Sequence, residues 1–393
     1  MSDKPDYNAL SLELHRLHRG KISVVSKVPV KTRYDLSIAY TPGVAEPCRR
    51  IAQNKDDAYT YTSKGNLIAV ITDGSAVLGL GNIGPLASLP VMEGKAVLFK
   101  EFADIDAIAL AIDTQDVDKF VETVKLISPA FGGINLEDIS APRCFEIEER
   151  LKKELCIPLF HDDQHGTAIV VLAGMINAMK LSGKSLDKIK IVFSGVGAAG
   201  IACAKMLLNY GAKNIIMVDT IGAIYDGRIE HMNSIKIEMS KLTNHHKETG
   251  LLKDVIKGAD VFIGVSAPGV LTADMIRTMN TKPIIFAMAN PIPEIMPDIA
   301  KQAGAFIVAT GRSDFANQIN NVLAFPGLMR GALNVRAKVV NDCMKIAAAE
   351  TLAAMVPNPT VDKIIPEPFE PDIAKKVAEQ VMKTAIKTGV NRI

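Results

Sequence analysis

The second half of the chain alternates short apolar runs with helix-like segments, and this alternation strongly limits the folds open to it. A buried helix-like stretch at 167–183 is followed by a strand, a helix and four further apolar runs. Strands that alternate with helices form a parallel sheet covered on both faces, and ligands bind outside the carboxyl ends of its strands. The sequence therefore predicts a doubly wound α/β domain. Its predicted elements after the first helix are "KIKIVFSG", "AGIACAKMLLNYG", "NIIMVD", "ADVFIGVS", "PIIFAMANP" and "FIVATG".

A glycine-rich turn joins the first of these strands to its helix, and the following strand ends at Asp219. In a Rossmann-like domain such a turn lets the backbone approach a pyrophosphate at the helix N-terminus, while the acid accepts hydrogen bonds from a ribose. A purely structural turn is the alternative, but the strand–turn–helix–strand context favours a dinucleotide. An acid disfavours a 2′-phosphate and Thr220 follows it, so we expect NAD rather than NADP unless later lysines or arginines reverse the preference. The turn consists of Gly195, Val196, Gly197, Ala198, Ala199 and Gly200.

The first part of the chain mixes helices with short strands. The runs at 67–74 and 107–113 are apolar and β-branched, as in buried strands, while glycines and prolines between them predict a loop over 76–102. We expect three parts: an N-terminal α/β domain over 1–164, a dinucleotide-binding domain over 165–360, and a connector with a terminal helix over 361–393. That helix is expected to pack back on the N-terminal domain.

Acidic residues gather in two places before the dinucleotide domain. Glu137 and Asp138 follow an apolar run, and "HDDQH" at 161–165 adds two aspartates. The adjacent acids alone would suit a solvated loop, but with Asp163 they make three carboxylates without thiols, a set suited to Mg²⁺ or Mn²⁺. The two histidines have the spacing of a zinc pair on a helix, yet neither a third ligand nor an H-E-x-x-H order accompanies them. The hard-metal interpretation is the stronger one.

Two further residues are candidates for proton transfer. Lys95 lies among glycine and apolar neighbours, and a lysine in a partly buried pocket has its pKa lowered enough to act as a base. Tyr40 precedes a Pro-Gly turn, where a phenol can face a ligand site. Taken alone, an ordinary surface position is the default interpretation of each residue.

Composition excludes several classes of protein. The 45 basic and 43 acidic residues give a net charge of +2, which argues against nucleic acid as a partner. No apolar run is long enough to span a bilayer, and the charged N-terminus does not resemble a signal peptide. The five cysteines are scattered and include no C-x-x-C pair, which indicates a reducing cytoplasm.

Seven ordered segments of the chain resemble the malic enzyme family, in its short bacterial form, over essentially the full length. The resemblance implies oxidative decarboxylation of L-malate to pyruvate and CO₂, with reduction of NAD(P)⁺, a divalent metal and a homodimer. The matching segments are "KVPVKTRYDLSIAYTPGVAEPC", "AVLGLGNIGPLASLPVMEGKAVLFK", "GGINLEDISAPRCFEIE", "PLFHDDQHGTA", "GVGAAG", "FAMANPIPEI" and "ANQINNVLAFPGLMRGAL".

The resemblance also implies roles for individual residues. Lys95, supported by Asp162, would take the proton of the C2 hydroxyl, and Tyr40 would protonate C3 of the enol. The implied metal ligands are Glu137, Asp138 and Asp163. The implied contacts of substrate carboxylate or nicotinamide are Asn290, Asn320 and Asn321.

One departure from the family pattern concerns the substrate carboxylate. Longer members carry an arginine where this chain has Ala76, so the carboxylate must be held by other groups, such as amides near 74–76 or a partner subunit. Two alternatives to the main function stay open. One is a malolactic enzyme that yields lactate without net reduction, and the other is a dinucleotide-binding sensor that has lost catalysis.

Overall fold

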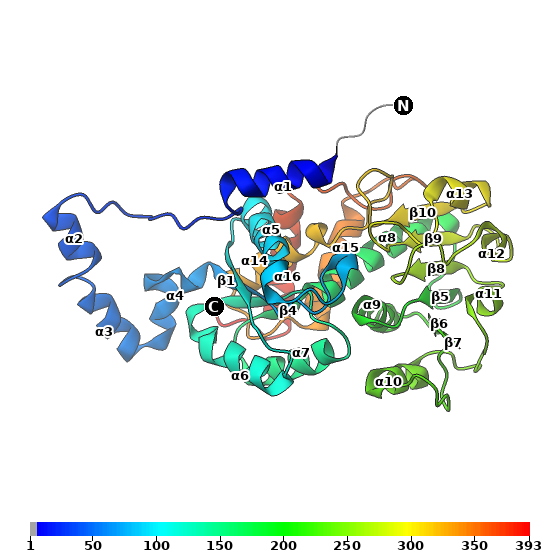
Figure 1. Cartoon of the computed structure of the whole chain (residues 1–393), viewed down its shortest axis with the longest axis horizontal. Helices are drawn as coiled ribbons and strands as arrows, with labels where there is room; N and C mark the ends of the chain where they lie inside the picture. The colour runs from blue at the N-terminus through cyan, green and yellow to red at the C-terminus, as the bar shows by residue number, and fades with distance from the viewer. Residues whose placement is uncertain (1–5) are drawn as a thin grey trace.

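The computed structural model describes residues 6–393, and two parallel β-sheets organise it (Figure 1). In the first sheet the strand order is β2-β1-β3-β4, and all pairs are parallel. The predicted strands at 67–74 and 107–113 are confirmed as β1 and β2. The four strands are β1 (Leu67–Thr72), β2 (Asp106–Ala111), β3 (Gly133–Leu136) and β4 (Leu159–His161).

Helices cover both faces of this sheet, because alternate side chains of its central strand point to opposite sides. Ile68 and Val70 join the large core cluster that includes Met92 of α5, whereas Ala69 and Ile71 face a second cluster with the helices opposite. The covering helices are α5 (Pro85–Ala103), α6 (Val117–Ile127) and α7 (Arg143–Glu154).

The second sheet has the order β10-β9-β8-β5-β6-β7 and is parallel except for the short edge strand β7. The chain runs outward from β5 to β7, then crosses to the other side of β5, which creates the topological switch point where dinucleotides bind. The predicted doubly wound domain is confirmed. Its strands are β5 (Lys190–Ser194), β6 (Asn214–Asp219), β7 (Gly222–Ala223), β8 (Val261–Gly264), β9 (Ile284–Ala287) and β10 (Ile307–Thr310).

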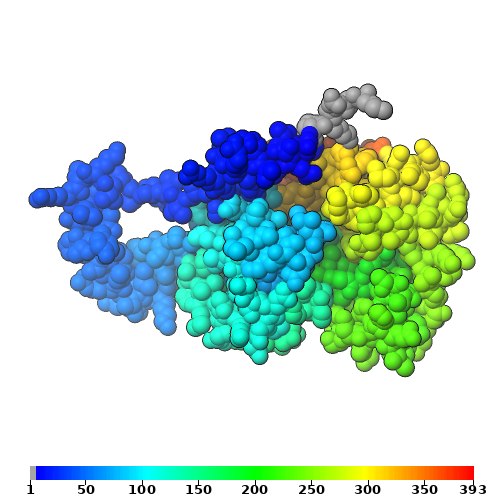
Figure 2. Space-filling model, in the orientation of Figure 1, coloured from blue at the N-terminus to red at the C-terminus, as the bar shows by residue number. Residues whose placement is uncertain are grey.

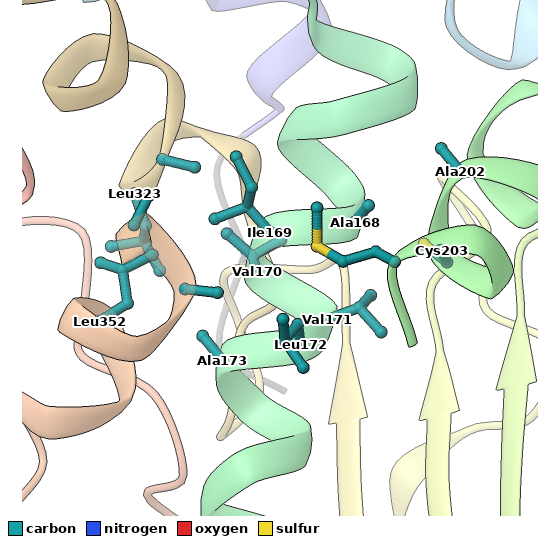
Figure 3. Packing of buried hydrophobic residues seen from close by; sticks show 14 of the residues in the cluster. Ala168, Ile169, Val170, Val171, Leu172, Ala173, Ala202, Cys203, Leu323 and Leu352 are labelled. Carbon is teal, nitrogen blue, oxygen red and sulfur yellow. The ribbon is translucent and has the colours of Figure 1, made fainter. Parts of the chain in front are cut away.

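Helix α8 (Thr167–Ser182) connects the two sheets and is apolar on nearly every face (Figure 3). It contacts α9 (Ala198–Asn209) on one side and α15 (Asp342–Ala354) on the other, and Gly183 ends it in a left-handed conformation. The remaining helices around the second sheet are short: α10 (Ser234–Leu242), α11 (Leu252–Val255), α12 (Ala273–Arg277) and α13 (Pro297–Gln302).

The terminal helix α16 (Ile373–Lys387) packs chiefly against α14 (Phe325–Asn334) and α15, and only a small contact reaches α5 of the N-terminal domain. Two glycines of α14 explain why α16 packs closely against it. A Cβ at Gly327 would lie 2.7 Å from the Ala374 carbonyl oxygen, and one at Gly331 would lie 2.6 Å from that of Ala378. The missing side chains therefore let the two helix backbones approach each other closely.

The loop predicted over 76–102 is wrong from residue 85 onward, because Pro85–Ala103 forms α5. Pro85 occupies the start of the helix, where its missing N–H does no harm, so it marks a beginning rather than a break. Pro90 lies inside the helix, but burial of one helical face outweighs that interruption. The buried residues of this face are Ser88, Met92, Lys95, Ala96 and Phe99.

The N-terminal segment leaves the body of the molecule as an arm (Figures 1 and 2). We use "arm" for residues 21–61; α1, which precedes it, lies along the body, and none of the helices of these two segments contains a buried residue. The helices are α1 (Tyr7–His18), α2 (Arg33–Ala39), α3 (Ala45–Gln53) and α4 (Ala58–Tyr61). Within residues 6–393, no helix combines the length and apolarity that crossing a membrane requires.

Short helical turns complete the chain. They are η1 (Lys55–Asp57), η2 (Ser63–Gly65), η3 (Leu78–Leu80), η4 (Ser128–Ala130), the π-helical turn η5 (Asp162–Gly166) and η6 (Asn321–Leu323).

Candidate active site

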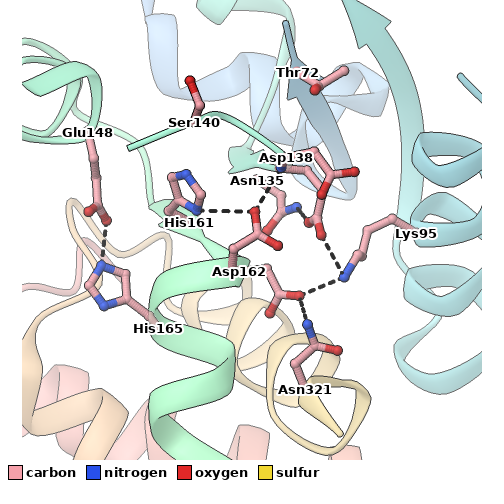
Figure 4. Close-up of polar contacts among 12 residues, drawn as sticks. Thr72, Lys95, Asn135, Asp138, Ser140, Glu148, His161, Asp162, His165 and Asn321 are labelled. Carbon is pink, nitrogen blue, oxygen red and sulfur yellow. Dashed lines mark hydrogen bonds and ion pairs between the residues drawn. The ribbon is translucent and has the colours of Figure 1, made fainter. Parts of the chain in front are cut away.

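The carboxyl ends of β3 and β4 bring the predicted acidic residues together (Figure 4). These neighbouring strands are parallel, so the residues that follow them meet at one edge of the sheet. Glu137 and Asp138 follow β3, whereas Asp162 and Asp163 begin η5 directly after β4. Lys95 reaches the same place from α5.

Lys95 is the centre of a buried ionic cluster. Its Nζ lies 2.6 Å from Asp162 Oδ2 and 3.0 Å from Glu137 Oε1, and the lysine side chain is 8% exposed. The same Nζ lies 4.4 Å from the centroid of the Phe325 ring, a cation–π contact. Asn321 donates a hydrogen bond to the Asp162 oxygen that Lys95 contacts, so Asp162 is held from two domains.

The charges around Lys95 reverse the expected direction of its pKa. Burial alone lowers the pKa of Lys95, as predicted, but the negative charges of Asp162 and Glu137 outweigh burial and raise it. Without a metal ion, the lysine therefore keeps its proton. The expectation of a lowered pKa is wrong for this state, because sequence spacing did not reveal that two carboxylates contact the same ammonium.

Glu137, Asp138 and Asp163 form a compact set of oxygen ligands. One carboxylate oxygen from each lies within 4.8 Å of the other two. Burial, reinforced by the Asp163 charge, raises the pKa of Asp138 to about 8, and burial raises that of Glu137 well above its usual value. Asp138 Oδ2 is buried and has no hydrogen-bond partner among the described residues. Crowded, desolvated carboxylates with an unpaired oxygen fit a divalent cation, which would neutralise their mutual repulsion.

The geometry of η5 depends on Gly166. A Cβ at this glycine would lie 1.9 Å from Asp162 Oδ1 and 3.0 Å from Asn321 Cβ. The absence of a side chain therefore makes room for the Asp162 carboxylate in its contact with Lys95. A π-helical turn at a functional site is a common device for aiming side chains.

The two histidines of "HDDQH" do not form a zinc pair. His161 Nδ1 lies 3.7 Å from Asp163 Oδ2, on the side of the acidic cluster, whereas His165 Nε2 lies 2.6 Å from Glu148 Oε1 (Figure 4). The turn between them is π-helical, so the α-helical geometry that would place them side by side is absent. This outcome supports the hard-metal interpretation.

The glycine-rich turn has the geometry of a dinucleotide site. Gly195 has φ 115°, and a Cβ on it would lie 2.6 Å from the Val265 carbonyl oxygen. A Cβ on Gly200 would lie 2.2 Å from the Gly195 carbonyl oxygen, so the helix and turn can meet only without side chains. Gly197 is the N-cap of α9, with Val196 before it and Ala198 and Ala199 after it. A cavity of about 440 Å³ opens between this turn and Asp219.

Asp219 is not free to bind a ribose as the sequence suggested. Arg228 Nη2 lies 2.9 Å from Oδ1 and 2.7 Å from Oδ2, Lys236 Nζ lies 2.7 Å from Oδ2, and Ile221 N lies 3.1 Å from Oδ1. These four contacts use the four acceptor positions of a carboxylate. One anion with two cations leaves a net positive charge beside the cavity. Sequence analysis missed Arg228 and Lys236, because no local pattern connects them to Asp219.

The asparagines and backbone amides that were predicted to contact the substrate or nicotinamide lie in different environments. Asn290 is exposed and follows β9, and its carbonyl oxygen lies 3.1 Å from the position of a Cβ at Gly79 in the N-terminal domain. Asn320 Oδ1 accepts a hydrogen bond from Val322 N and so caps η6. The Ala76 amide donates to the Asp138 carbonyl oxygen, and those of residues 74 and 75 are also bonded. The expectation that these amides hold a substrate carboxylate therefore loses its basis.

Tyr40 does not join the cluster. It lies at the end of α2, in the arm that leaves the body, and it is 66% exposed. Sequence analysis also missed Asn135, whose Nδ2 donates to Glu137 Oε2 at 2.7 Å and fixes that carboxylate. Alternation along β3 would have placed Asn135 and Glu137 on one face of the strand.

The two sites lie side by side, since α9, which begins at the glycine-rich turn, contacts η5, which carries Asp162 and Asp163. A dinucleotide turn next to a buried lysine and three carboxylates suited to a divalent cation is the arrangement of an oxidoreductase.

Comparisons with known proteins identify the family. Models of the malic enzyme N-terminal domain and the malic enzyme NAD binding domain match residues 19–152 and 164–386. The bifunctional malic/malolactic enzyme of Bacillus subtilis is 60% identical over 98% of this chain and 94% of its own length. The NAD-dependent malic enzyme of Geobacillus stearothermophilus is 56% identical over 95% of this chain and 78% of its own. The malic enzyme structure from Pyrococcus horikoshii covers 98% of this chain and 92% of its own length, with a TM-score of 0.94 and 47% identity. The chain belongs to the malic enzyme family.

Proposed function

We propose that this protein catalyses the divalent-metal-dependent oxidative decarboxylation of L-malate to pyruvate and CO₂, with NAD(P)⁺ as hydride acceptor. The observation that carries this proposal is the buried cluster of Lys95 with Asp162 and Glu137, next to a dinucleotide turn. A non-catalytic sensor has no use for a desolvated lysine between two carboxylates. Burying such charges is costly, and clusters of this kind gather at functional sites.

Glu137, Asp138 and Asp163 would hold Mg²⁺ or Mn²⁺, and a bound cation would supply Lewis-acid polarisation of the substrate oxygen. Lys95 is oriented by Asp162 to receive the proton of the C2 hydroxyl at its Nζ. Glu137 would share its negative charge with the cation, so less of that charge would hold the proton on Lys95. This shift would bring the lysine toward the neutral form that a general base requires.

The reaction assay is direct. L-malate with Mn²⁺ should produce reduced cofactor, followed by its absorbance, with either NAD⁺ or NADP⁺. A malolactic reaction is the second candidate, because the Bacillus subtilis relative is described as a bifunctional malic/malolactic enzyme. Lactate formation without net cofactor reduction would reject the main proposal in favour of the second.

We place the enzyme in the cytoplasm, which its five free cysteines support.

We propose that the enzyme accepts both dinucleotides and that Lys236, which lines the cofactor cavity, contacts the 2′-phosphate of NADP⁺. The net positive charge around Asp219 supports this proposal over a preference for NAD alone. Lys236→Ala should lower kcat/KM for NADP⁺ by about 10- to 100-fold, the worth of one charged hydrogen bond. The value for NAD⁺ should change little. Lys241→Ala, on the exposed end of the same helix, is the matched control. An equal loss with both cofactors would refute the assignment.

Tyr40 lies outside the Lys95 cluster of its own chain, so we propose a homodimer in which the arm supplies Tyr40 to the partner's site. Exposed apolar side chains along α2 support this, because a soluble chain rarely leaves such a surface uncovered. They are Tyr34, Leu36 and Ile38 in α2 and Tyr40 at its end, and the exposed Val44 at the start of α3 continues them.

Complementation tests the shared site. Mixtures of Tyr40→Phe and Lys95→Met chains, each inactive alone, should regain about a quarter of wild-type activity, because half the dimers are mixed and each has one complete site. Tyr61→Phe, also exposed in the arm, is the control and should keep full activity. Failure to regain activity in dimers shown to have exchanged chains would place Tyr40 in its own chain's site or outside catalysis.

A further inference from the structure

A buried ion pair lies at the carboxyl edge of the first sheet, where the acidic residues gather. Asp73 directly follows β1, and its side chain is fully buried. Arg143 begins α7, and its Nη2 lies 2.8 Å from Asp73 Oδ2, while its Nη1 donates to the Gln115 carbonyl oxygen at 2.8 Å. A buried carboxylate needs a compensating partner, so this contact fixes the arginine as well as the aspartate. The proposed reaction assigns no role to either residue.

Arg143 joins two loops that leave neighbouring parallel strands. We name residues 73–76, after β1, the first loop, and residues 138–142, in the connection from β3 to α7, the second loop. The same Nη2 group donates to Ser75 Oγ of the first loop at 2.9 Å and to Ser140 Oγ of the second loop at 3.2 Å. A planar guanidinium held in this way keeps the two loops at a fixed separation.

The buried hydroxyl of Ser75 is the junction between the loops. It donates to Asp73 Oδ1 at 2.5 Å, and it accepts from the Ser140 backbone N–H at 2.9 Å as well as from Arg143 Nη2. A hydroxyl offers one donor and two acceptor positions, so these three contacts use its whole capacity. The second loop is therefore fixed to the first through both the side chain and the backbone of Ser140.

Asp138 begins the second loop in a backbone conformation that needs such support (Figure 4). Its φ is 54°, in the left-handed region, which is unfavourable for a residue with a Cβ. Its carbonyl oxygen accepts from the Ala76 N–H of the first loop at 3.0 Å, and its own N–H donates to Asp163 Oδ2 at 2.7 Å. Strained backbone persists only where the surroundings fix it, so the link between the loops helps to hold Asp138 in place.

We propose that Arg143 is a positioning residue of the metal site. By joining the two loops, it holds Asp138 in the conformation that directs its carboxylate toward those of Glu137 and Asp163. Arg143 acts through the loops, since its hydrogen bonds and its ion pair within residues 6–393 go to groups other than these three carboxylates. The inference rests on the metal site of the proposed function, and its test separates the two.

Metal binding without substrate tests this role. Electron paramagnetic resonance of free Mn²⁺ measures the Mn²⁺ dissociation constant of the full-length enzyme in the absence of malate. Arg143→Met should raise this constant about 10- to 100-fold, the usual effect of losing a group that orients a metal ligand. The NADH dissociation constant, followed by NADH fluorescence, should change less than about twofold, because neither loop lines the cofactor cavity. A general loss of structure would weaken both.

Arg150→Met is the matched control, because Arg150 lies in the same helix and also pairs with carboxylates. Its Nη1 lies 2.7 Å from Asp118 Oδ1 and 3.3 Å from Glu146 Oε1, and neither residue belongs to the two loops. The Mn²⁺ dissociation constant of this variant should change less than about twofold, because a partly exposed ion pair outside the loops does not orient Asp138.

Ser75→Ala is a second variant that keeps the ion pair of Asp73 with Arg143 and removes only the hydroxyl between the loops. It decides the question if Arg143→Met does not fold. Its Mn²⁺ dissociation constant should rise about 10-fold. The double variant should show a loss near that of the more damaging single variant, well below the product of the two single losses, because both substitutions break one link.

The outcomes separate this inference from the metal site itself. Wild-type Mn²⁺ affinity in folded Arg143→Met, or in Ser75→Ala where the first variant does not fold, would overturn the positioning role if Asp163→Asn still weakens binding. Equal losses of Mn²⁺ and NADH affinity would overturn it as well, because they indicate general disruption. Wild-type Mn²⁺ affinity in Asp163→Asn would remove the metal site, and the positioning role with it. None of these readouts requires turnover of malate.

Discussion

Replacing Gly166 by alanine should separate Asp162 from Lys95 while leaving the fold in place. Cβ atoms essentially never approach another heavy atom closer than 3.0 Å, and the new one would lie 1.9 Å from Asp162 Oδ1. The carboxylate therefore has to retreat by about 1.1 Å. Its other oxygen, now 2.6 Å from Lys95 Nζ, would move to roughly 3.7 Å, beyond the hydrogen-bond limit of about 3.2 Å.

The expected loss follows from this displacement. Misplacing a catalytic group by about 1 Å costs on the order of 100-fold in rate, so kcat for malate oxidation should fall by about that factor. Helix propensity predicts that the substitution raises the free energy of unfolding, because alanine is more favourable than glycine by about 1 kcal/mol inside a helix. The assay is initial-rate kinetics with L-malate, Mn²⁺ and cofactor, with circular dichroism as a check on folding.

Gly94→Ala is the matched control, because Gly94 also lies in a helix and directly precedes Lys95. A Cβ there would meet only the flexible end of Lys21, 3.2 Å away. This variant should keep the wild-type kcat. Full activity in Gly166→Ala would refute the claim that the glycine makes room for the Asp162–Lys95 contact.

Three further outcomes follow from the site. Lys95→Met should lower kcat by about 10²–10⁴-fold, as expected for loss of a general base, while Mn²⁺ binding measured by magnetic resonance stays intact; turnover at the wild-type rate would reject the base. Asp163→Asn should weaken Mn²⁺ binding about 10-fold or more, and an unchanged dissociation constant would remove Asp163 from the metal site. His165 has a pKa of about 4, so the unfolded chain takes up its proton first as pH falls below about 6.5. The free energy of unfolding should therefore fall between pH 6.5 and 4, by up to about 1.4 kcal/mol per pH unit from this residue. Urea denaturation at several pH values measures this dependence, and the free energy of unfolding of His165→Gln should change less steeply with pH.

Local patterns were sufficient for much of the fold and for the acidic cluster. Most strands of the second sheet and β1 of the first contain an apolar run, and the turn from Gly195 to Gly200 is specified by its own residues. Glu137, Asp138 and Asp163 could be grouped from sequence because three carboxylates without thiols suit a hard divalent ion, whereas the pairing of β3 and β4 that brings them together was seen only in the structure. These inferences succeed where short-range chemistry fixes the conformation.

Contacts between distant segments set the rest. Lys95 acquires its raised pKa from residues in two other elements, and Asp219 is bound by Arg228 and Lys236 through a fold that no spacing rule describes. The loop predicted over 85–102 failed because prolines and glycines were read locally, whereas burial of one face decides that α5 forms. Tyr40 lies on an arm whose helices contain no buried residue, so packing of the core does not place it.

The aromatic ring next to Lys95 has a consequence for the order in which the active site forms during protein synthesis. Phe325, whose ring contacts the lysine ammonium, begins α14, and α14 is packed against α16 through its two glycines. Lys95 and the strands of the first sheet emerge from the ribosome long before residues 325–387 do. N-terminal domains generally fold first during synthesis. The first sheet can form early, but Lys95 acquires its aromatic neighbour only after Phe325 has been synthesised and α14 has packed against α5. Catalytic competence is therefore acquired late, when translation of this segment is complete.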